Sequence, residues 1–335
     1  MILKRIGIDL GTTNILFYIP GKGIVINEPS VVALEVSQNK VVAFGGEAKE
    51  MLGRTPDSIV AAHPLKDGVI ANFGIAKAMI SHYINRLSGR LRFLKPEIMI
   101  SIPAGATSTE RRAVTDAAIQ AGAKAAYLIK EPVAAALGAG ISIAGPSGNM
   151  IIDIGGGTSE VAVLALGDIV ASTSVRVGSN RFDEAIAKEI RKKHNLVIGE
   201  VTAELVKVKI GSALPLKKEL SMEVTGCNAI SGLPESLIVS SSDIVLALRD
   251  PINEIISAVK AVLQKTPPEL AADIMDKGIV MTGGGAQLRG LDSLLTKVTG
   301  VPCQTAEDPM LSVVKGTGIA VENLDAFKKS VLWLR

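Results

Sequence analysis

The chain has 335 residues, more than one typical domain, and 47% of them are apolar, so two lobes with sizeable cores are expected. Charged residues make up 21% and are well mixed, and the net charge of +3 is small. This balance argues against a disordered chain and against nucleic acid as a partner. The two cysteines, Cys227 and Cys303, lack the spacing of a metal site and are expected to be reduced thiols.

The first part of the chain predicts a three-strand meander followed by a hairpin and alternating helices and strands. The meander consists of RIGIDL, ILFYI and IVI, and the hairpin of VVALEV and KVVAFG. A helix is expected over about 76–87, and EIMISIP reads as a buried strand. Thr107 and Glu110 form a capping box for a helix that ends near Gly122. The strand AAYLI then leads into the helix PVAAALGAG, which is expected to begin at Pro132.

From Asn149 a similar order recurs. MIIDIGGGTSEVAVLAL, a Gly167-Asp168 turn and IVASTSVRV predict a second meander. Helices are expected over about 181–193, 201–211 and 244–263, with a hairpin-like segment before the last of them. GIVMTGGGAQLRGLDSLL predicts a strand, a glycine turn and a helix. Because both halves open with a meander and an Asp-x-Gly turn, the sequence indicates an internal duplication.

Two further segments bear on the membrane and on the end of the chain. The uncharged run 132–152 is long enough to span a bilayer, but its glycines and proline argue against a transmembrane helix, and MILKR leads into a strand without a signal peptide. The mean hydropathy of +0.36 is high for a soluble protein, which points to apolar surface for a membrane or a subunit. In LDAFKKSVLWLR, helical spacing predicts a stripe that docks on the body: Leu324, Phe327, Val331 and Leu334.

The glycine turns predict a phosphate site. In DLGTTN, Gly11 lets the backbone approach an anion, while Thr12, Thr13 and Asn14 supply donors. DIGGGT offers the same through Gly155, Gly156, Gly157 and Thr158, so two facing hairpins would clamp a polyphosphate. The third turn, TGGGA at 282–286, has no aspartate and suits a nucleoside or an α-phosphate. One such turn alone would be an ordinary connection, but three at strand ends favour phosphate binding. The absence of a Walker A lysine and of GxGxxG after a strand excludes P-loop and Rossmann sites.

Three carboxylates complete this chemistry. Asp9 and Asp153 each stand two residues before a loop glycine, where a carboxylate could hold Mg²⁺ through its waters. The ion would neutralise charge as the terminal phosphoryl group leaves. Glu131, in IKEP, is placed where it could orient the attacking water. It could equally compensate the charge at a helix N-terminus, and the residues alone leave both interpretations open.

Seven segments together resemble the MreB family of bacterial actin-like cytoskeletal ATPases. They are IGIDLGTTN, KGIVINEPSVVAL, PLKDGVIANF, EPVAAALGAG, IIDIGGGTSEVAV, IGEVTAELVKVKIGSA and TGGGAQLRGLD. DLGTT is shared with Hsp70 chaperones and sugar kinases, whereas KGIVINEPSVVAL and PLKDGVIA are more specific. The resemblance implies an α/β, actin-like (ribonuclease H-like) duplicated fold with two lobes of two subdomains each around a nucleotide cleft. The lobes would be 1–148, with a small subdomain at about 33–75, and 149–335, with an inserted subdomain at about 180–260.

The resemblance also implies ATP and Mg²⁺ as ligands and assigns residues to them. Asp9 and Asp153 would serve the metal, and Glu131, assisted by Thr158, would place the attacking water. The phosphates would lie between Thr12, Thr13 and Asn14 on one side and Gly155, Gly156, Gly157 and Thr158 on the other. Ribose and base would meet Glu204 and Lys207, and the adenosine side would meet Gly283, Gly284, Gly285 and Gln287. By spacing alone, Glu204 and Lys207 would form a surface ion pair.

Three positions depart from the pattern of the family. Thr13 stands where alanine is common, and VGSN at 177–180 replaces a Gly-Gly-Asp run, which removes a carboxylate beside the cleft. Asn72 replaces a frequent aspartate. The second departure bears directly on the ribose or metal contacts expected on that side of the cleft.

The resemblance further implies an anionic membrane surface and a second copy as partners. The loop RLRFLKP places Leu91, Phe93 and Leu94 among basic residues, which suits contact with anionic lipid on the inner face of the cytoplasmic membrane. The alternative is a loop tucked onto its own domain. Family members form paired antiparallel protofilaments through heterologous contacts and work with membrane proteins of the cell-elongation machinery.

The resulting expectation is a cytoplasmic, filament-forming protein that hydrolyses ATP slowly and organises wall synthesis to maintain rod shape. A chaperone-type ATPase would need a peptide-binding domain, which the sequence does not show before Arg335. A small-molecule kinase of the same fold would need a sugar pocket and usually a longer chain. Glu131 and Thr158 argue against a paralogue that does not hydrolyse nucleotide.

Overall fold

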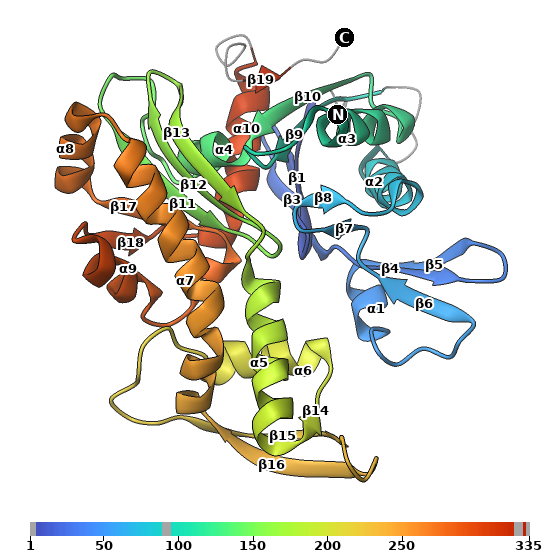
Figure 1. The fold of residues 1–335 in the computed structure, drawn as a ribbon. Helices are drawn as coiled ribbons and strands as arrows, with labels where there is room; N and C mark the ends of the chain where they lie inside the picture. Colours follow the sequence, from blue (N-terminus) through green and yellow to red (C-terminus); the bar gives the residue numbers. More distant parts are fainter. Residues whose placement is uncertain (1–4, 89–94, 325–330, 333–335) are drawn as a thin grey trace.

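Two similar β-sheets form the centres of two lobes. The computed structural model describes residues 5–88, 95–324 and 331–332 (Figure 1). The first sheet has the strand order β19-β10-β9-β1-β2-β3, and the second has the order β13-β12-β11-β17-β18. In both, a three-strand antiparallel meander is extended by two strands parallel to its first strand. The internal duplication predicted from the sequence is therefore confirmed.

The strands of the first sheet are β1 (Arg5–Leu10), β2 (Asn14–Ile19), β3 (Gly23–Pro29), β9 (Glu97–Ile102), β10 (Ala125–Lys130) and β19 (Val331–Leu332). Those of the second are β11 (Asn149–Ile154), β12 (Ser159–Ala165), β13 (Asp168–Val175), β17 (Ile279–Thr282) and β18 (Cys303–Thr305). β12 is buried along its whole length, which explains its run of apolar residues.

Two helices lie between the sheets and join the lobes: α4 (Glu131–Gly138) and α10 (Ser312–Glu322). The core around them contains residues of both sheets, including Met99 of β9 and Ile151 of β11. The helices approach so closely that a Cβ on Gly316 would lie 1.8 Å from the backbone oxygen of Ala134. Because only glycine leaves room for this contact, the crossing depends on the residue at 316.

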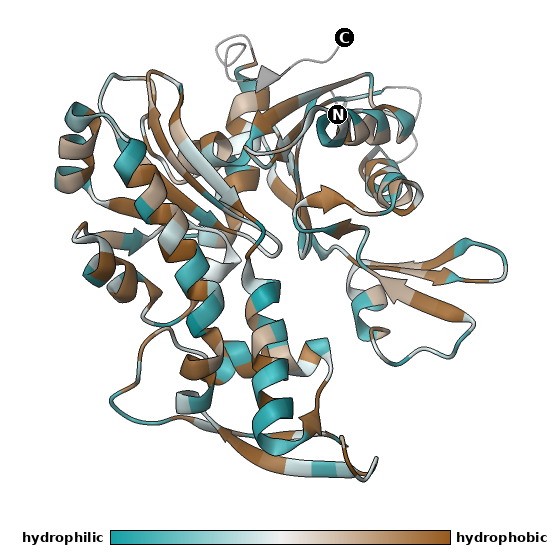
Figure 2. Cartoon of the chain, viewed as in Figure 1, coloured by the Kyte–Doolittle hydropathy of each residue, from teal (hydrophilic) through white to brown (hydrophobic). Residues whose placement is uncertain are grey.

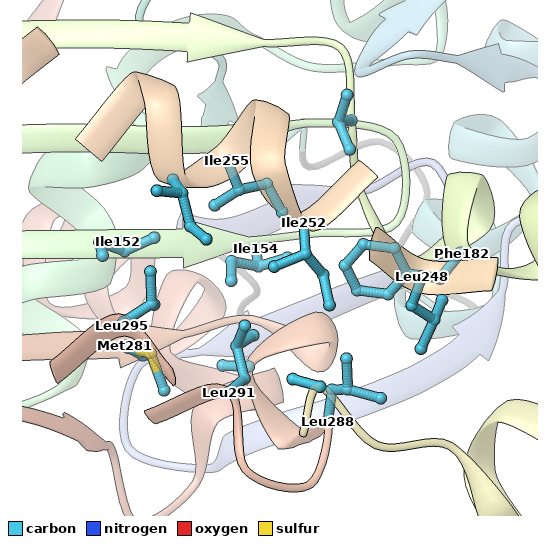
Figure 3. Close-up of a cluster of buried hydrophobic side chains, with 14 of the residues drawn as sticks. Ile152, Ile154, Phe182, Leu248, Ile252, Ile255, Met281, Leu288, Leu291 and Leu295 are labelled. Carbon is cyan, nitrogen blue, oxygen red and sulfur yellow. The ribbon is translucent and has the colours of Figure 1, made fainter. Parts of the chain in front are cut away.

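Helices cover the outer faces of both sheets. α2 (Phe73–Ser88) and α3 (Ser108–Gln120) pack on the first, and α3 begins with the predicted capping box of Thr107 and Glu110. On the second lie α7 (Ser241–Lys265), α8 (Pro268–Lys277) and α9 (Leu291–Thr299), while α5 (Ser179–His194) packs against α7 and extends away from the sheet toward the bottom of the molecule (Figure 1). Figure 3 shows side chains of α7, such as Leu248 and Ile252, gathered with Ile154 of β11 in this core. Teal and brown turns alternate along α7 in Figure 2, as expected for a helix with one buried face.

A small unit is attached to each lobe. The unit of the first lobe contains β4 (Val32–Glu35), β5 (Lys40–Phe44), α1 (Gly45–Glu50) and β6 (Ile59–Ala62), and the hairpin β7 (Leu65–Lys66)–β8 (Val69–Ile70) follows it. The unit of the second contains β14 (Leu196–Val197), α6 (Glu200–Ile210), β15 (Ser221–Asn228) and β16 (Pro234–Ser240). In Figure 1 these units form the lower right and the bottom of the molecule. We refer to them as the first and the second small unit.

Two local predictions were wrong. α4 begins at Glu131 rather than at Pro132, so Glu131 is itself the first helical residue. Val331 lies in a strand paired with Ile129 of β10, not on the predicted helical stripe, because the sheet edge offers backbone partners that helical spacing does not reveal. Within the described residues, no helix combines the length and the apolar character needed to cross a bilayer.

Candidate functional site

A cavity of about 670 Å³ lies between the two lobes. All of the residues that the resemblance assigned to phosphate, metal, water or nucleoside line it, and so does Gly11. They are Asp9, Gly11, Thr12, Thr13, Asn14, Glu131, Asp153, Gly155, Gly156, Gly157, Thr158, Glu204, Lys207, Gly283, Gly284, Gly285 and Gln287. These residues come from segments far apart in the chain, and the duplicated sheets bring them to one place. The volume lies in the range of pockets that bury a small organic ligand.

The two glycine turns meet at the floor of this cavity. The turn between β1 and β2 carries Thr12, whose Oγ1 accepts a hydrogen bond of 2.9 Å from the backbone N–H of Gly68. A Cβ on Gly157, in the turn between β11 and β12, would lie 2.6 Å from the same oxygen. A Cβ on Gly156 would lie 2.0 Å from Oγ1 of Thr13. Glycine is therefore required at both positions because the turns are in contact, and their backbone N–H groups remain close to any anion between them.

The first residues of α5 bind to both turns. The backbone N–H groups of Ser179 and Asn180 donate to the carbonyl oxygens of Gly155 and Gly156, each at 2.9 Å. The Thr13 hydroxyl donates to Oδ1 of Asn180, also at 2.9 Å. Two positions that depart from the usual family pattern thus contact each other across the lobes. An amide oxygen at 180 stands in place of the expected carboxylate and accepts a hydrogen bond that an alanine at 13 could not donate.

Two carboxylates face the cavity from the ends of β1 and β11. Asp9 accepts a hydrogen bond of 3.0 Å from Ser101, and burial together with the charge of Asp153 raises its pKa to about 7. Asp153 accepts one of 2.8 Å from Thr282, and burial raises its pKa to about 6. Within the described residues, each receives a single side-chain hydrogen bond, and two acids this close together and largely withdrawn from water are costly unless a cation offsets their charge.

Glu131 stands at the start of α4, directly after β10. Burial raises the pKa of its carboxyl group well above the usual value, and the negative charges of Glu160, Asp153 and Asp9 add to this effect. Glu160 was missed by sequence reasoning. It is buried in β12, accepts hydrogen bonds from the Ala104 N–H at 3.0 Å and from Ser174, and has a pKa raised to about 7 by burial. A charged residue within the otherwise apolar SEVAVLA was the signal that could have found it.

At the other end of the cavity, Glu204 and Lys207 of α6 do not pair with each other. Lys207 Nζ lies 2.7 Å from Oδ2 of Asp183 and 3.2 Å from the carbonyl oxygen of Ser179. Glu204 Oε2 lies 2.7 Å from Nζ of Lys49, in the opposite lobe. The surface pair predicted by spacing is therefore replaced by two contacts with distant parts of the chain, because both side chains point into the cleft rather than along the helix.

The third glycine turn follows β17 and passes close beneath β11. A Cβ on Gly283, whose φ is 83°, would lie 2.3 Å from the carbonyl oxygen of Ile154. The turn forms a short 3-10 helix, η1 (Gly284–Gln287), and α9 begins only at Leu291, so the helix predicted directly after the turn starts later. Arg289 and Met310, the latter in η2 (Pro309–Leu311), line the same end of the cavity and were not predicted.

Leu91, Phe93 and Leu94, the residues expected to contact lipid, lie outside the described residues.

Comparison with known proteins assigns the chain to a family. The profile of the MreB/Mbl protein family matches residues 3–329. The chain belongs to the MreB/Mbl family. It is 48% identical over 332 residues to the cell shape-determining protein Mbl of Bacillus subtilis (strain 168), which covers 99% of this chain and 100% of that protein. It is 47% identical over 330 residues to the cell shape-determining protein MreB of Escherichia coli (strain K12), covering 97% and 95% of the two chains.

Solved structures of similar proteins have the same fold. The crystal structure of MreB 5 of Spiroplasma citri bound to AMPPNP superposes with a TM-score of 0.92 at 39% identity, over 97% of this chain and 98% of that one. The MamK double helical filament superposes with a TM-score of 0.80 at 22% identity, over 95% and 99% of the two chains, which shows the fold alone. The predicted actin-like fold and the resemblance to MreB are therefore confirmed.

Proposed function

We propose that the chain binds ATP with Mg²⁺ in the cavity between its lobes and hydrolyses it slowly. The observation that carries this proposal is the pair of glycine turns. The two turns contact each other, and they line one cavity together with the other predicted nucleotide residues. The MreB 5 of Spiroplasma citri, a relative at 39% identity, has been solved with ADP and with AMPPNP. Both findings favour an adenine nucleotide over a sugar or a peptide as the main ligand.

Different residues of the site would bind the phosphates, the metal ion and the attacking water. Backbone N–H groups within residues 11–14 and 156–158 bind the phosphates, because glycines allow the backbone to approach, while the N–H of Gly155 donates to the carbonyl oxygen of Thr158. The donor set suits a hydrated divalent ion, since Asp153 is buried and Asp9 is half-buried, the two lie close enough for the charge of Asp153 to raise the pKa of Asp9, and each receives one side-chain hydrogen bond. When bound, Mg²⁺ would offset negative charge on the phosphates. Glu131 orients the attacking water, assisted by Thr158, and both residues line the cavity.

At the nucleoside end, Glu204 and Lys207 bind ribose and base, and the turn from Gly283 to Gln287 borders the adenosine. Thr13 contributes to phosphate binding through its backbone, because its hydroxyl already donates to Asn180.

We also propose the lobe division 1–148 and 149–335, with small subdomains at about 33–75 and 180–260. α10 and β19 then return from the second range to the first sheet.

The protein is proposed to assemble head to tail into paired antiparallel protofilaments on the inner face of the cytoplasmic membrane. There it would organise cell-wall elongation with membrane proteins of that machinery and so maintain rod shape. Support comes from the relatives named cell shape-determining proteins, at 47–48% identity over nearly the whole chain. Leu91, Phe93 and Leu94 are the proposed lipid contact, through apolar insertion beside basic residues.

The test is electron microscopy of the purified chain with Mg-ATP on an anionic lipid monolayer, combined with a phosphate-release assay. Paired straight filaments flat on the lipid, with slow phosphate release, are expected. A variant with Phe93→Ser and Leu94→Ser should form filaments in solution but not on lipid. Monomers at every protein concentration, with ATP turnover stimulated by a sugar, would instead favour the small-molecule kinase.

A further inference from the structure

The nucleoside end of the cavity is completed by a residue from the opposite lobe. Lys49, on α1 of the first small unit, lines the cavity together with Glu204 and Lys207 of α6. Its Nζ lies 2.7 Å from Oε2 of Glu204, and both side chains are about one-third exposed. The pair spans the two small units above the nucleotide cavity, so it exists only while these units stay together.

α1 holds Lys49 in place because the helix is fixed at its other end. Its first residue, Gly45, has a φ of 63°, and a Cβ there would lie 2.7 Å from the Tyr83 hydroxyl and 2.8 Å from Oε2 of Glu28. The same carboxylate accepts a hydrogen bond of 3.3 Å from the N–H of Gly46. Since α1 is anchored on β3 at its start, the position of Lys49 near its end follows from a rigid, short helix.

Two further contacts cross between the lobes beside this pair. His63 Nε2 lies 3.0 Å from Oε1 of Glu200, at the start of α6, while its Nδ1 lies 3.0 Å from the carbonyl oxygen of Ser30. Deeper in the cleft, Thr13 donates to Asn180. The three contacts surround a small hollow that adjoins the nucleotide cavity. Three members of this group line both spaces: Thr13, Lys49 and Glu204, of which Lys49 is the one on the first small unit.

The charges around the hollow explain why Lys49 matters. Three acids of the second lobe, Asp183, Glu200 and Glu204, face it. Lys207 pairs with Asp183, and His63 pairs with Glu200, which leaves Lys49 as the partner of Glu204. Without Lys49, the carboxylate of Glu204 would repel both a polyanionic ligand and the neighbouring acids, and it would have no fixed position.

We propose that Lys49 is a positioning residue of the nucleotide site, which holds Glu204 from the opposite lobe and makes nucleotide retention depend on contact between the two small units. This inference rests on the proposed binding of an adenine nucleotide. It assigns the first small unit a part in ligand release in addition to its place in the fold. The nucleotide leaves when the Lys49–Glu204 pair and its neighbour His63–Glu200 separate.

The experiment measures release of a fluorescent ADP analogue after mixing with excess ATP. Four proteins are compared: the wild type, Lys49→Gln, Glu204→Gln and the double variant. Because the pair is partly exposed, Lys49→Gln should speed release by about threefold to tenfold, and raised salt should speed release from the wild type more than from Lys49→Gln. In the Glu204→Gln background, the further change Lys49→Gln should have no effect.

Two variants serve as controls. Lys40→Gln removes an exposed charge from β5 of the same small unit and should leave release unchanged. Lys49→Arg keeps the charge and should release ADP as the wild type does, which separates the ion pair from general damage to α1. Unchanged release from Lys49→Gln, or equal acceleration with and without Glu204, would overturn the inference while leaving the proposed function intact. A wild type that binds no ADP analogue would overturn both.

Discussion

Replacing Gly316 by alanine tests whether the close crossing of α4 and α10 joins the lobes. The added Cβ would lie 1.8 Å from the backbone oxygen of Ala134 and 2.5 Å from its carbonyl carbon. Side-chain rotation cannot relieve a clash with backbone, so the helices must move apart by roughly 1 Å or more in a close-packed interior. That movement opens the core that contains residues of both sheets.

The free energy of unfolding should fall by about 2 kcal/mol or more. Overpacking in a core costs about 1–3 kcal/mol. This site belongs at the upper end of that range because both atoms of Ala134 that the new Cβ would meet are backbone atoms. The higher helix propensity of alanine offsets at most about 1 kcal/mol of this loss of stability. For a chain of this size, the melting temperature should fall by roughly 3 °C.

The assay is thermal and urea unfolding of the nucleotide-free protein, with Gly74→Ala as the matched control. Gly74 also lies in a helix, but it is exposed, and the nearest atom to an added Cβ is Oδ1 of Asn72 at 3.5 Å. Gly74→Ala should therefore be neutral or stabilising by up to about 1 kcal/mol. If Gly316→Ala proves as stable as the wild type, or gains stability as the control does, the argument for a backbone-tight crossing is refuted.

Three other changes have defined outcomes. Glu131→Gln should slow ATP hydrolysis by about a hundredfold with ADP affinity unchanged, measured by phosphate release and titration; unaltered hydrolysis would remove Glu131 from the mechanism. The contact with Glu200 raises the pKa of His63 above its usual value, so the pair holds at lower pH and ADP release should accelerate as pH rises through that pKa. His63→Gln should remove the part of the pH dependence that is due to this pair, while the carboxyl groups of the cavity still titrate, and identical pH profiles for the wild type and His63→Gln would contradict it. Thr13→Ala should cost about 1 kcal/mol of stability, with no further loss on adding Asn180→Ala; additive losses would show that the hydroxyl and the amide act separately.

The parts of the site that follow one another in the chain could be predicted from the sequence. Asp9 and Asp153 each precede a glycine turn between two apolar strands. The alternation of apolar residues, the turn residues and the repetition of this pattern can all be read from the sequence, and the folded chain has the strands and turns that they predict. The capping box of Thr107 and Glu110 is local in the same way, and the structure contains it. Such features depend on neighbours within a few residues, which is why sequence reasoning found them.

The contacts that cross the cleft could not be predicted. Lys49 and Glu204 are 155 positions apart, and His63 and Glu200 are 137 apart, so no spacing rule links them. The i,i+3 rule favoured a Glu204–Lys207 pair, but the buried carboxylate of Asp183 is a stronger partner for Lys207 than an exposed neighbour. In general, a charged side chain pairs with a distant buried group rather than with a neighbour in the sequence when the buried charge would be costly to leave unpaired.

The position of α10 also has a consequence for synthesis of the chain. This helix is buried on most sides, packs on β1 and α4, and contributes Val313, Ala320 and Val321 to the core shared by the two sheets. Between Ile102, the end of β9, and Ser312, the start of α10, a ribosome adding about 5–20 residues per second needs roughly 10–40 s. During that interval the first sheet lacks its covering helix. The nascent chain therefore presents an apolar surface that chaperones would recognise, and a protein shortened before α10 would aggregate rather than fold.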